Sequence, residues 1–314
     1  MNDANMYPHA PLIEAFCFEQ GEGESHMPAK KRADTAVVDV SDRLNPTTVD
    51  AMLAPAAPAP AVEAEQLSLF ELAPWADDMR AIPNDLARSA LFTVRNKKQK
   101  REAVEGRPIF HVNRDVTITF TGIELRADDD ELVWNQVLEY AKRLPLGAPV
   151  QFSLYQLCKD LGWHINSRYY KRAEASLTRL MTGVMQFQSE RIGRLKSLKL
   201  IDEFDVYDRG TNRAYCQVKI PVLIGTLFKG NHYSKFVWEK YRELSPIARR
   251  MFDYAVSHKN PYPLKLETFR QMCASETSRA AKWKEQSKDA CQELTDSQLL
   301  KLASVQGDEI HFDR

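Results

Sequence analysis

The feature that most restricts the possible folds is an order of predicted elements that occurs twice along the chain. Each copy has an apolar helix, a short helix, a longer helix with basic residues, and then alternating residues of a hairpin type. A repeat of this kind arises by chance much less often than a single copy, so the sequence predicts two similar modules. The predicted helices span residues 127–144, 152–163 and 165–187 in the first copy and 244–258, 266–276 and 277–294 in the second.

Several of these helices carry recognisable end signals. Ser245 precedes Pro246 at the start of one helix, and Gly162 follows the end of another. The run Asp128–Glu131 opens the first helix, where carboxylates are favoured by about 0.3–1 kcal/mol each. A metal site is the alternative for this run. Successive helical residues face different directions, however, so helix capping is the favoured interpretation.

Alternating residues predict strands beside the helices. Residues 115–122 alternate as one strand, 187–220 predict a hairpin with its turn near 208–212, and 300–314 predict a terminal hairpin. A short helix, a turn, a longer helix and a hairpin together are typical of a winged-helix DNA-binding module. We therefore expect an α+β fold with two tandem winged-helix domains, at residues 107–225 and 226–314.

A long N-terminal tail is predicted before these domains. Residues 52–65 are rich in alanine and proline and cannot form a core, and the tail is expected to be disordered over residues 1–106. It ends in a basic linker at 95–102, either a solvated linker or an arm that contacts phosphates. Residues 1–90 hold 15 acidic and 6 basic residues, whereas the remainder holds 28 and 37. The basic body indicates a polyanionic partner.

The basic residues of the two longer predicted helices are the candidate DNA contacts. A solvated face on a structural helix would give the same pattern in one copy, but its recurrence favours DNA binding. We expect DNA contacts from Arg168, Lys171, Arg172 and Arg179 in the first module and from Arg279, Lys282, Lys284 and Lys288 in the second.

The sequence gives little support for an ATPase, another enzyme or a metal-binding protein. The stretch 225–232 has Asn231 where a phosphate-binding loop needs lysine, and the scattered histidines lack metal-ligand spacing. No catalytic constellation is recognisable, so an enzyme, a metal centre and a cofactor are not expected. Five widely spaced cysteines predict reduced thiols. No secretory signal or membrane-spanning run is recognised, and a cytoplasmic location is expected.

Four stretches of the chain resemble the TrfA-type replication initiators of broad-host-range bacterial plasmids. They are residues 66–75, 126–147, 155–174 and 232–273. The resemblance implies tandem winged-helix domains that bind direct repeats, called iterons, in double-stranded origin DNA and open AT-rich DNA, with contact to the single strands. It also implies recruitment of the host initiator, the replicative helicase and the sliding clamp, and a dimer that becomes a monomer to bind.

The resemblance also assigns a role to a compact apolar peptide in the tail. Its clamp-binding residues fall on Gln66, Leu67, Ser68, Leu69 and Phe70. An apolar cleft in a partner could receive the leucine and phenylalanine side chains, and a flexible tether would let them reach it. Packing on the chain's own domain with Trp75 is the alternative. A plain winged-helix transcriptional repressor remains the other candidate function, and this peptide counts against it.

A second translation start is also expected. Met27 follows two Gly-Glu pairs, whose purine-rich codons could resemble a ribosome-binding site, and residues 27–32 are similar to the beginning of the family's short form.

Overall fold

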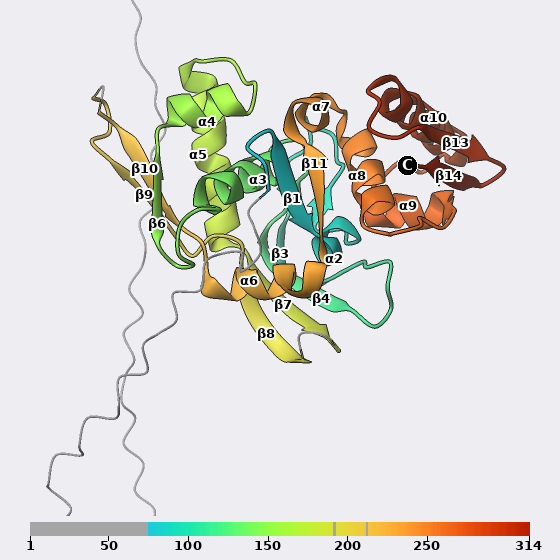
Figure 1. Ribbon diagram of the computed structural model, residues 1–314, viewed down its shortest axis with the longest axis horizontal. Helices are drawn as coiled ribbons and strands as arrows, with labels where there is room; N and C mark the ends of the chain where they lie inside the picture. Colours follow the sequence, from blue (N-terminus) through green and yellow to red (C-terminus); the bar gives the residue numbers. More distant parts are fainter. Residues whose placement is uncertain (1–74, 191–192, 212) are drawn as a thin grey trace, which may run out of the picture. The chain divides into compact units, whose positions relative to one another are not determined.

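The computed structural model describes residues 75–190, 193–211 and 213–314, and these belong to one compact unit. The unit mixes helices with several small sheets (Figure 1). This confirms the α+β class. The predicted disorder of the tail up to residue 74, the peptide 66–70 and Met27 lie outside the described residues.

The first module contains three helices and a three-stranded sheet. The middle strand of the sheet is the last in sequence, since the order is β6-β10-β9 and both pairings are antiparallel. The elements are α3 (Asp130–Ala141), β6 (Pro149–Phe152), α4 (Leu154–Asp160), α5 (Ser167–Thr182), β9 (Glu203–Tyr207) and β10 (Tyr215–Lys219).

The second module repeats this topology. Its sheet has the order β12-β14-β13, again antiparallel with the last strand in the middle. Both modules therefore run helix, strand, helix, helix, strand, strand, with two further strands inserted after the third helix of the first module. The elements are α8 (Pro246–Val256), β12 (Leu264–Lys265), α9 (Leu266–Met272), α10 (Ala280–Asp296), β13 (Leu302–Gln306) and β14 (Glu309–Asp313).

Side-chain caps explain where most of these helices begin. The side chains of Asp129, Ser153, Asn166 and Ser245 accept hydrogen bonds from backbone N–H groups at the starts of α3, α4, α5 and α8. Such caps stabilise a helix by about 1 kcal/mol because its first N–H groups have no partner within the helix. The capping role predicted for the acidic run is confirmed for Asp129. The N-cap residue of α10, Arg279, makes no side-chain cap bond.

A separate four-stranded sheet corrects the prediction for residues 187–220. Its order is β3-β4-β7-β8, with β3 (Ala103–Ile109), β4 (Thr117–Ile123), β7 (Val184–Ser189) and β8 (Gly193–Lys199). The single expected hairpin is two hairpins: β7–β8 extends the β3–β4 pair, and β9–β10 joins the module sheet. Alternation predicts strands but does not specify their partners, which lie far away in sequence.

The tail prediction is also wrong for residues 75–106, which are structured. Strand β1 (Met79–Pro83) pairs with β11 (Tyr233–Val237), and β2 (Phe92–Thr93) pairs with β5 (Leu125–Arg126). The side chains of Trp75, Ile82 and Leu86 are buried. Residues 75–106 show no helical or strand periodicity in their sequence. Their apolar residues pack on segments that are distant in the chain, so the local pattern did not predict this structure.

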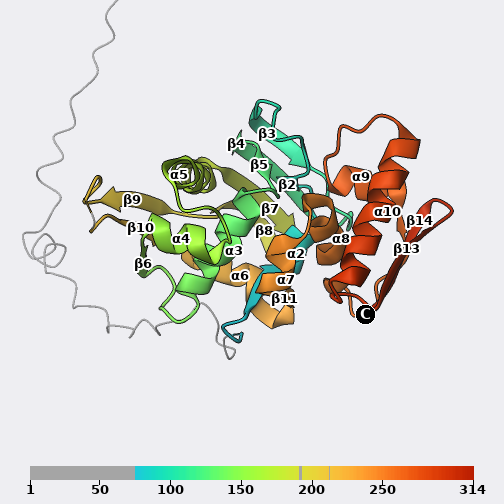
Figure 2. The same ribbon diagram turned by 90° about the horizontal axis from the view of Figure 1, so that it is seen from above.

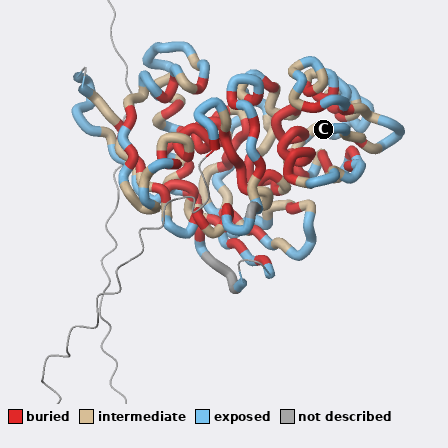
Figure 3. Tube along the Cα trace, in the orientation of Figure 1, coloured by how far each residue is buried: buried red, intermediate tan, exposed pale blue. Residues whose placement is uncertain are grey.

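Short elements and strand β11 form the connection between the modules. The short elements are η2 (Val222–Ile224), α6 (Gly225–Phe228), η3 (Lys229–Asn231) and α7 (Trp238–Glu243). Helix α2 (Asn84–Ala87) follows β1 earlier in the chain. The Trp238 Nε1 atom donates to the Asp160 carbonyl at 2.9 Å, which fastens α7 to the end of α4. Buried residues gather where α3, β1 and α8 meet (Figure 3).

Candidate nucleic-acid interface

Helix α5 presents one exposed stripe to solvent. Its members are Arg168, Lys171, Ala175, Thr178 and Thr182, at the spacing of a single helical face. Two basic side chains stand at the N-terminal end, and three small side chains follow them. The major groove of B-DNA is wide enough to admit an α-helix, and the side chains of this stripe are free to contact a groove.

The other two basic residues predicted on α5 have partners within the protein. The Arg179 Nη2 atom donates to Asp130 Oδ1 at 2.7 Å, and its side chain is 14% exposed. Arg172 donates to the Asp128 carboxylate, and its guanidinium group lies 4.5 Å from the ring centroid of Trp163. The expectation that these two arginines form an outer basic face is corrected: they fasten α5 to the start of α3.

An acidic cluster at residues 128–130 receives these arginines together with Arg101. The Arg101 guanidinium lies 2.6 Å from Asp129 and 2.7 Å from Asp130. Burial and the neighbouring Asp129 raise the pKa of Asp130. Burial also acts to raise the pKa of Asp129, but Arg101 and Arg179 outweigh it and the pKa falls below its usual value. The cluster therefore holds α3, α5 and the linker together electrostatically.

Helix α10 is basic in its first half and acidic farther on. Arg279 and Lys288 are exposed. The Lys282 Nζ atom lies 3.1 Å from Glu285 in the same helix, while Lys284 Nζ lies 3.6 Å from Asp308 in the β13–β14 turn. These surface pairs contribute little to stability. The four predicted basic residues of the second module thus remain accessible to an external anion.

The predicted basic linker forms a loop between β2 and β3. Lys97, Lys98 and Lys100 are exposed. The loop is fixed at two points: Lys97 Nζ lies 3.0 Å from Asp128, and Gln99 Nε2 donates to Glu276 at 2.7 Å. It therefore reaches from the start of α3 to the turn between α9 and α10.

A buried ion-pair network joins the two modules, and sequence reasoning missed it. Arg250 on α8 is fully buried and lies 2.7 Å from Glu131 and 2.9 Å from Asp253. It also donates to the Ala87 carbonyl at 3.0 Å and the Ser89 carbonyl at 2.6 Å. Since Glu131 belongs to α3, the two modules are linked through paired buried charges. In the sequence, the one sign of this network was Arg250, a charged residue among the apolar residues of α8.

Metal binding, membrane insertion and thiol chemistry can also be assessed from the described residues. Within them, no group of three or more His, Cys, Asp or Glu side chains could hold a metal ion, and no described helix is long and apolar enough to cross a membrane. The thiols of Cys158, Cys216, Cys273 and Cys291 are buried and free, and burial raises their pKa values, to about 11 for Cys158. Burial and a raised pKa both reduce the reactivity of a thiol, because the thiolate is the nucleophile.

Comparison with known proteins gives a consistent result. A family model described as TrfA protein matches residues 32–314. A plasmid replication initiator protein TrfA from Escherichia coli is 61% identical over 249 residues, which cover 79% of this chain and 65% of that protein. The chain therefore matches slightly less than two thirds of that relative's length.

Solved structures show a weaker likeness. A crystal structure of RctB domains 2–3 is 13% identical with a TM-score of 0.44, and covers 71% of this chain and 84% of its own. Another, of a selenomethionine derivative of RctB domains 2 and 3, is 8% identical with a TM-score of 0.46, over 67% and 86%.

Proposed function

Since the chain belongs to the TrfA protein family, we propose that it is a plasmid replication initiator that binds iterons at a plasmid origin. In this proposal it is a DNA-binding protein rather than an enzyme. It promotes opening of AT-rich DNA and recruits host replication proteins, in the bacterial cytoplasm.

The observation that carries the proposal is the repeated topology with a basic helix in each copy. Both modules have the same strand order and place a long helix, α5 or α10, before the hairpin of the sheet. We propose that both are winged-helix domains, within residues 107–225 and 226–314, whose wings are β9–β10 and β13–β14. Of the strands before residue 103, β1 pairs with β11, within residues 226–314, and β2 pairs with β5, within residues 107–225. Two linked modules on one duplex reinforce each other's binding.

We propose that the predicted DNA-contact residues act in two ways, directly and indirectly. Arg168 and Lys171 contact DNA from α5, whereas Arg172 and Arg179 act by holding that helix on α3. The second module contributes its four basic residues, which are Arg279, Lys282, Lys284 and Lys288. The exposed lysines of the 95–102 loop contact phosphates between the modules, because the loop is bound to both of them. Figure 2 shows β9 and β10 of the first module and α10, β13 and β14 of the second at opposite ends of the described unit.

The proposed partners follow from the family. They are double-stranded origin DNA, single-stranded AT-rich DNA, the host initiator and helicase, a second copy in a dimer–monomer equilibrium, and the sliding clamp. The clamp would bind Gln66 to Phe70, and translation from Met27 would preserve both this peptide and the folded unit.

Footprinting of the purified protein on its own plasmid's origin tests this function. We expect protection of a series of direct repeats, which disappears when Arg168 and Lys171 are both replaced by alanine. Protection of a single operator near a promoter, with no effect of the protein on plasmid maintenance, would instead identify a transcriptional repressor.

A further inference from the structure

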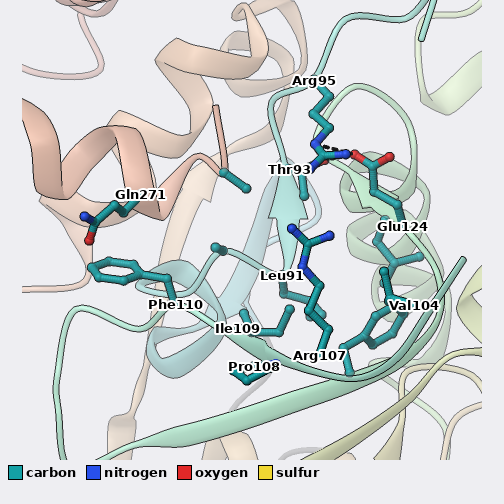
Figure 4. Close-up of a pocket in the computed structure, with 14 residues that line it drawn as sticks. Leu91, Thr93, Arg95, Val104, Arg107, Pro108, Ile109, Phe110, Glu124 and Gln271 are labelled. Atoms are coloured by element: carbon teal, nitrogen blue, oxygen red, sulfur yellow. Dashed lines mark hydrogen bonds and ion pairs between the residues drawn. The ribbon is translucent and has the colours of Figure 1, made fainter. Parts of the chain in front are cut away.

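A cavity of about 240 Å³ has no lining residue from α5 or α10. Figure 4 shows the residues that line it. It is enclosed by β2, β3, β4 and β5 together with the end of α9, so both halves of the described unit contribute to it. Most of its lining is apolar. The apolar residues that line it are Ala90, Leu91, Val104, Pro108, Ile109, Phe110, Phe120, Leu125 and Ala274.

A β-bulge in β3 shapes one wall of this cavity. The pairing of β3 with β4 shifts between Val104 and Arg107. Gly106, inside the bulge, has a φ of 55°, a conformation that favours glycine. A bulge bends its strand and changes the direction of the following side chains. Arg107, which follows the bulge, reaches into the space from below while Arg95 reaches into it from above (Figure 4).

The Nε atom of Arg95 is a buried donor without a hydrogen bond among the described residues. The Arg95 side chain is 9% exposed, and its Nε atom makes no hydrogen bond to any described residue, although it forms an ion pair with Glu124. The closest carboxylate oxygen, on Glu124, is 3.6 Å from Nε. A buried donor without an acceptor costs about 1–3 kcal/mol, so its presence beside an open cavity indicates an external acceptor.

Three carboxylates pair with the arginines around the cavity. Glu124, the only carboxylate among the lining residues, is paired with Arg126 at 3.0 Å and accepts from Thr93 at 2.5 Å. At the rim, Glu102 lies 2.9 Å from Arg95 and 2.8 Å from Arg107. Arg107 is 46% exposed, so its guanidinium group can turn toward a ligand. Glu276, also at the rim, lies 3.3 Å from Arg95.

We infer that this cavity binds a small carboxylic acid with a single apolar ring. The ring packs against the apolar walls, and the carboxylate accepts hydrogen bonds from Arg95 Nε and the Arg107 guanidinium group. The cavity is smaller than the usual 300–1,000 Å³ of sites for drug-sized ligands, which restricts the ligand to one ring and a short chain. This inference does not depend on DNA binding.

Phenylacetate is a suitable probe for the full-length protein, measured by saturation-transfer NMR and calorimetry without DNA. We expect saturable binding at millimolar concentration, and binding of the uncharged isostere phenylacetamide that is weaker by about tenfold or more. Absence of saturable phenylacetate binding, or equal affinity for phenylacetamide, would overturn the inference.

Three variants locate the site. Arg107→Gln should weaken phenylacetate binding by about tenfold or more, and Val104→Phe should abolish it by filling the cavity. Arg114→Gln, an exposed arginine outside the cavity, is the matched control and should bind as the unmodified protein does. Because Val104→Phe could disturb β3, the decisive variant is Arg107→Gln: unchanged affinity there would refute the assignment.

Discussion

Arginines of one helix perform two different tasks in this protein. Arg168 projects from α5 into solvent, whereas Arg179 on the same helix is paired with a fully buried aspartate. The difference is set by Asp129 and Asp130, which belong to another helix. A basic residue at the expected helical position is therefore insufficient evidence of a DNA contact unless its neighbours are known.

Single substitutions on α5 should separate these tasks. Arg179→Ala leaves Asp130 with one guanidinium partner fewer, so we expect a decrease of about 1–3 kcal/mol in unfolding free energy by urea titration. Arg168→Ala combined with Lys171→Ala should change stability by less than about 0.5 kcal/mol per residue but reduce DNA affinity. The salt slope of binding should also fall by about one for each phosphate that the variant no longer touches. Equal unfolding free energies for the two variants would contradict the division.

The fully buried Arg250 should be more sensitive still. Arg250→Met removes the charge that compensates Glu131 and Asp253, and we expect a decrease of about 3–5 kcal/mol in unfolding free energy. Adding Glu131→Gln and Asp253→Asn to this variant should recover part of that stability, because no unpaired charge then remains buried. No recovery would show that shape, rather than charge, makes Arg250 necessary.

At the scale of elements, the helices were predictable and the strand partners were not. The ranges expected for 127–144, 152–163 and 165–187 contain α3, α4 and α5, because spacing and caps are local signals. By contrast, β1 pairs with β11 and β7 pairs with β4 across long sequence separations. Helix positions of the candidate interface could therefore be predicted, while the partners of Arg172, Arg179 and the linker could not.

The exposed stripe of α5 gives a prediction about one whole helix face. Ala175→Glu places a negative charge in the middle of the stripe without filling any core space. We expect DNA affinity to fall by about tenfold or more in gel-shift titrations, because a carboxylate would lie against phosphates or base edges. Gln292→Glu, on an exposed and acidic part of α10, adds the same charge elsewhere and should have little effect. If both variants bind alike, α5 does not face the duplex.

At the scale of the whole molecule, the Glu131–Arg250 link fixes the two modules relative to each other. Proteins with freely jointed modules tolerate changes in the spacing of their half-sites, whereas rigid ones do not. Inserting about five base pairs, half a helical turn, between the two halves of a bound repeat should therefore weaken binding strongly. Inserting a full turn should also weaken it. Footprints that adapt to either insertion would contradict a fixed arrangement.

The tail peptide gives a prediction independent of the fold. Leu69→Ala with Phe70→Ala should weaken clamp binding by roughly two to four orders of magnitude, since each buried side chain contributes about 1.5–3 kcal/mol. Origin-DNA affinity and melting temperature should be unchanged. A drop of several degrees in melting temperature with clamp binding intact would show instead that the peptide packs on its own domain.

The pairing of β1 with β11 determines where mechanical tension enters the molecule. A pull on any segment preceding residue 75 arrives first at Trp75, whose indole donates to Glu139 at 2.6 Å, and at Asp77, which lies 2.8 Å from Lys142. It then loads the hydrogen bonds between β1 and β11, next to the joint of the modules. Tension from the preceding segment would therefore act on the joint between the modules. The positions of α5 and α10 on a bound duplex would change little.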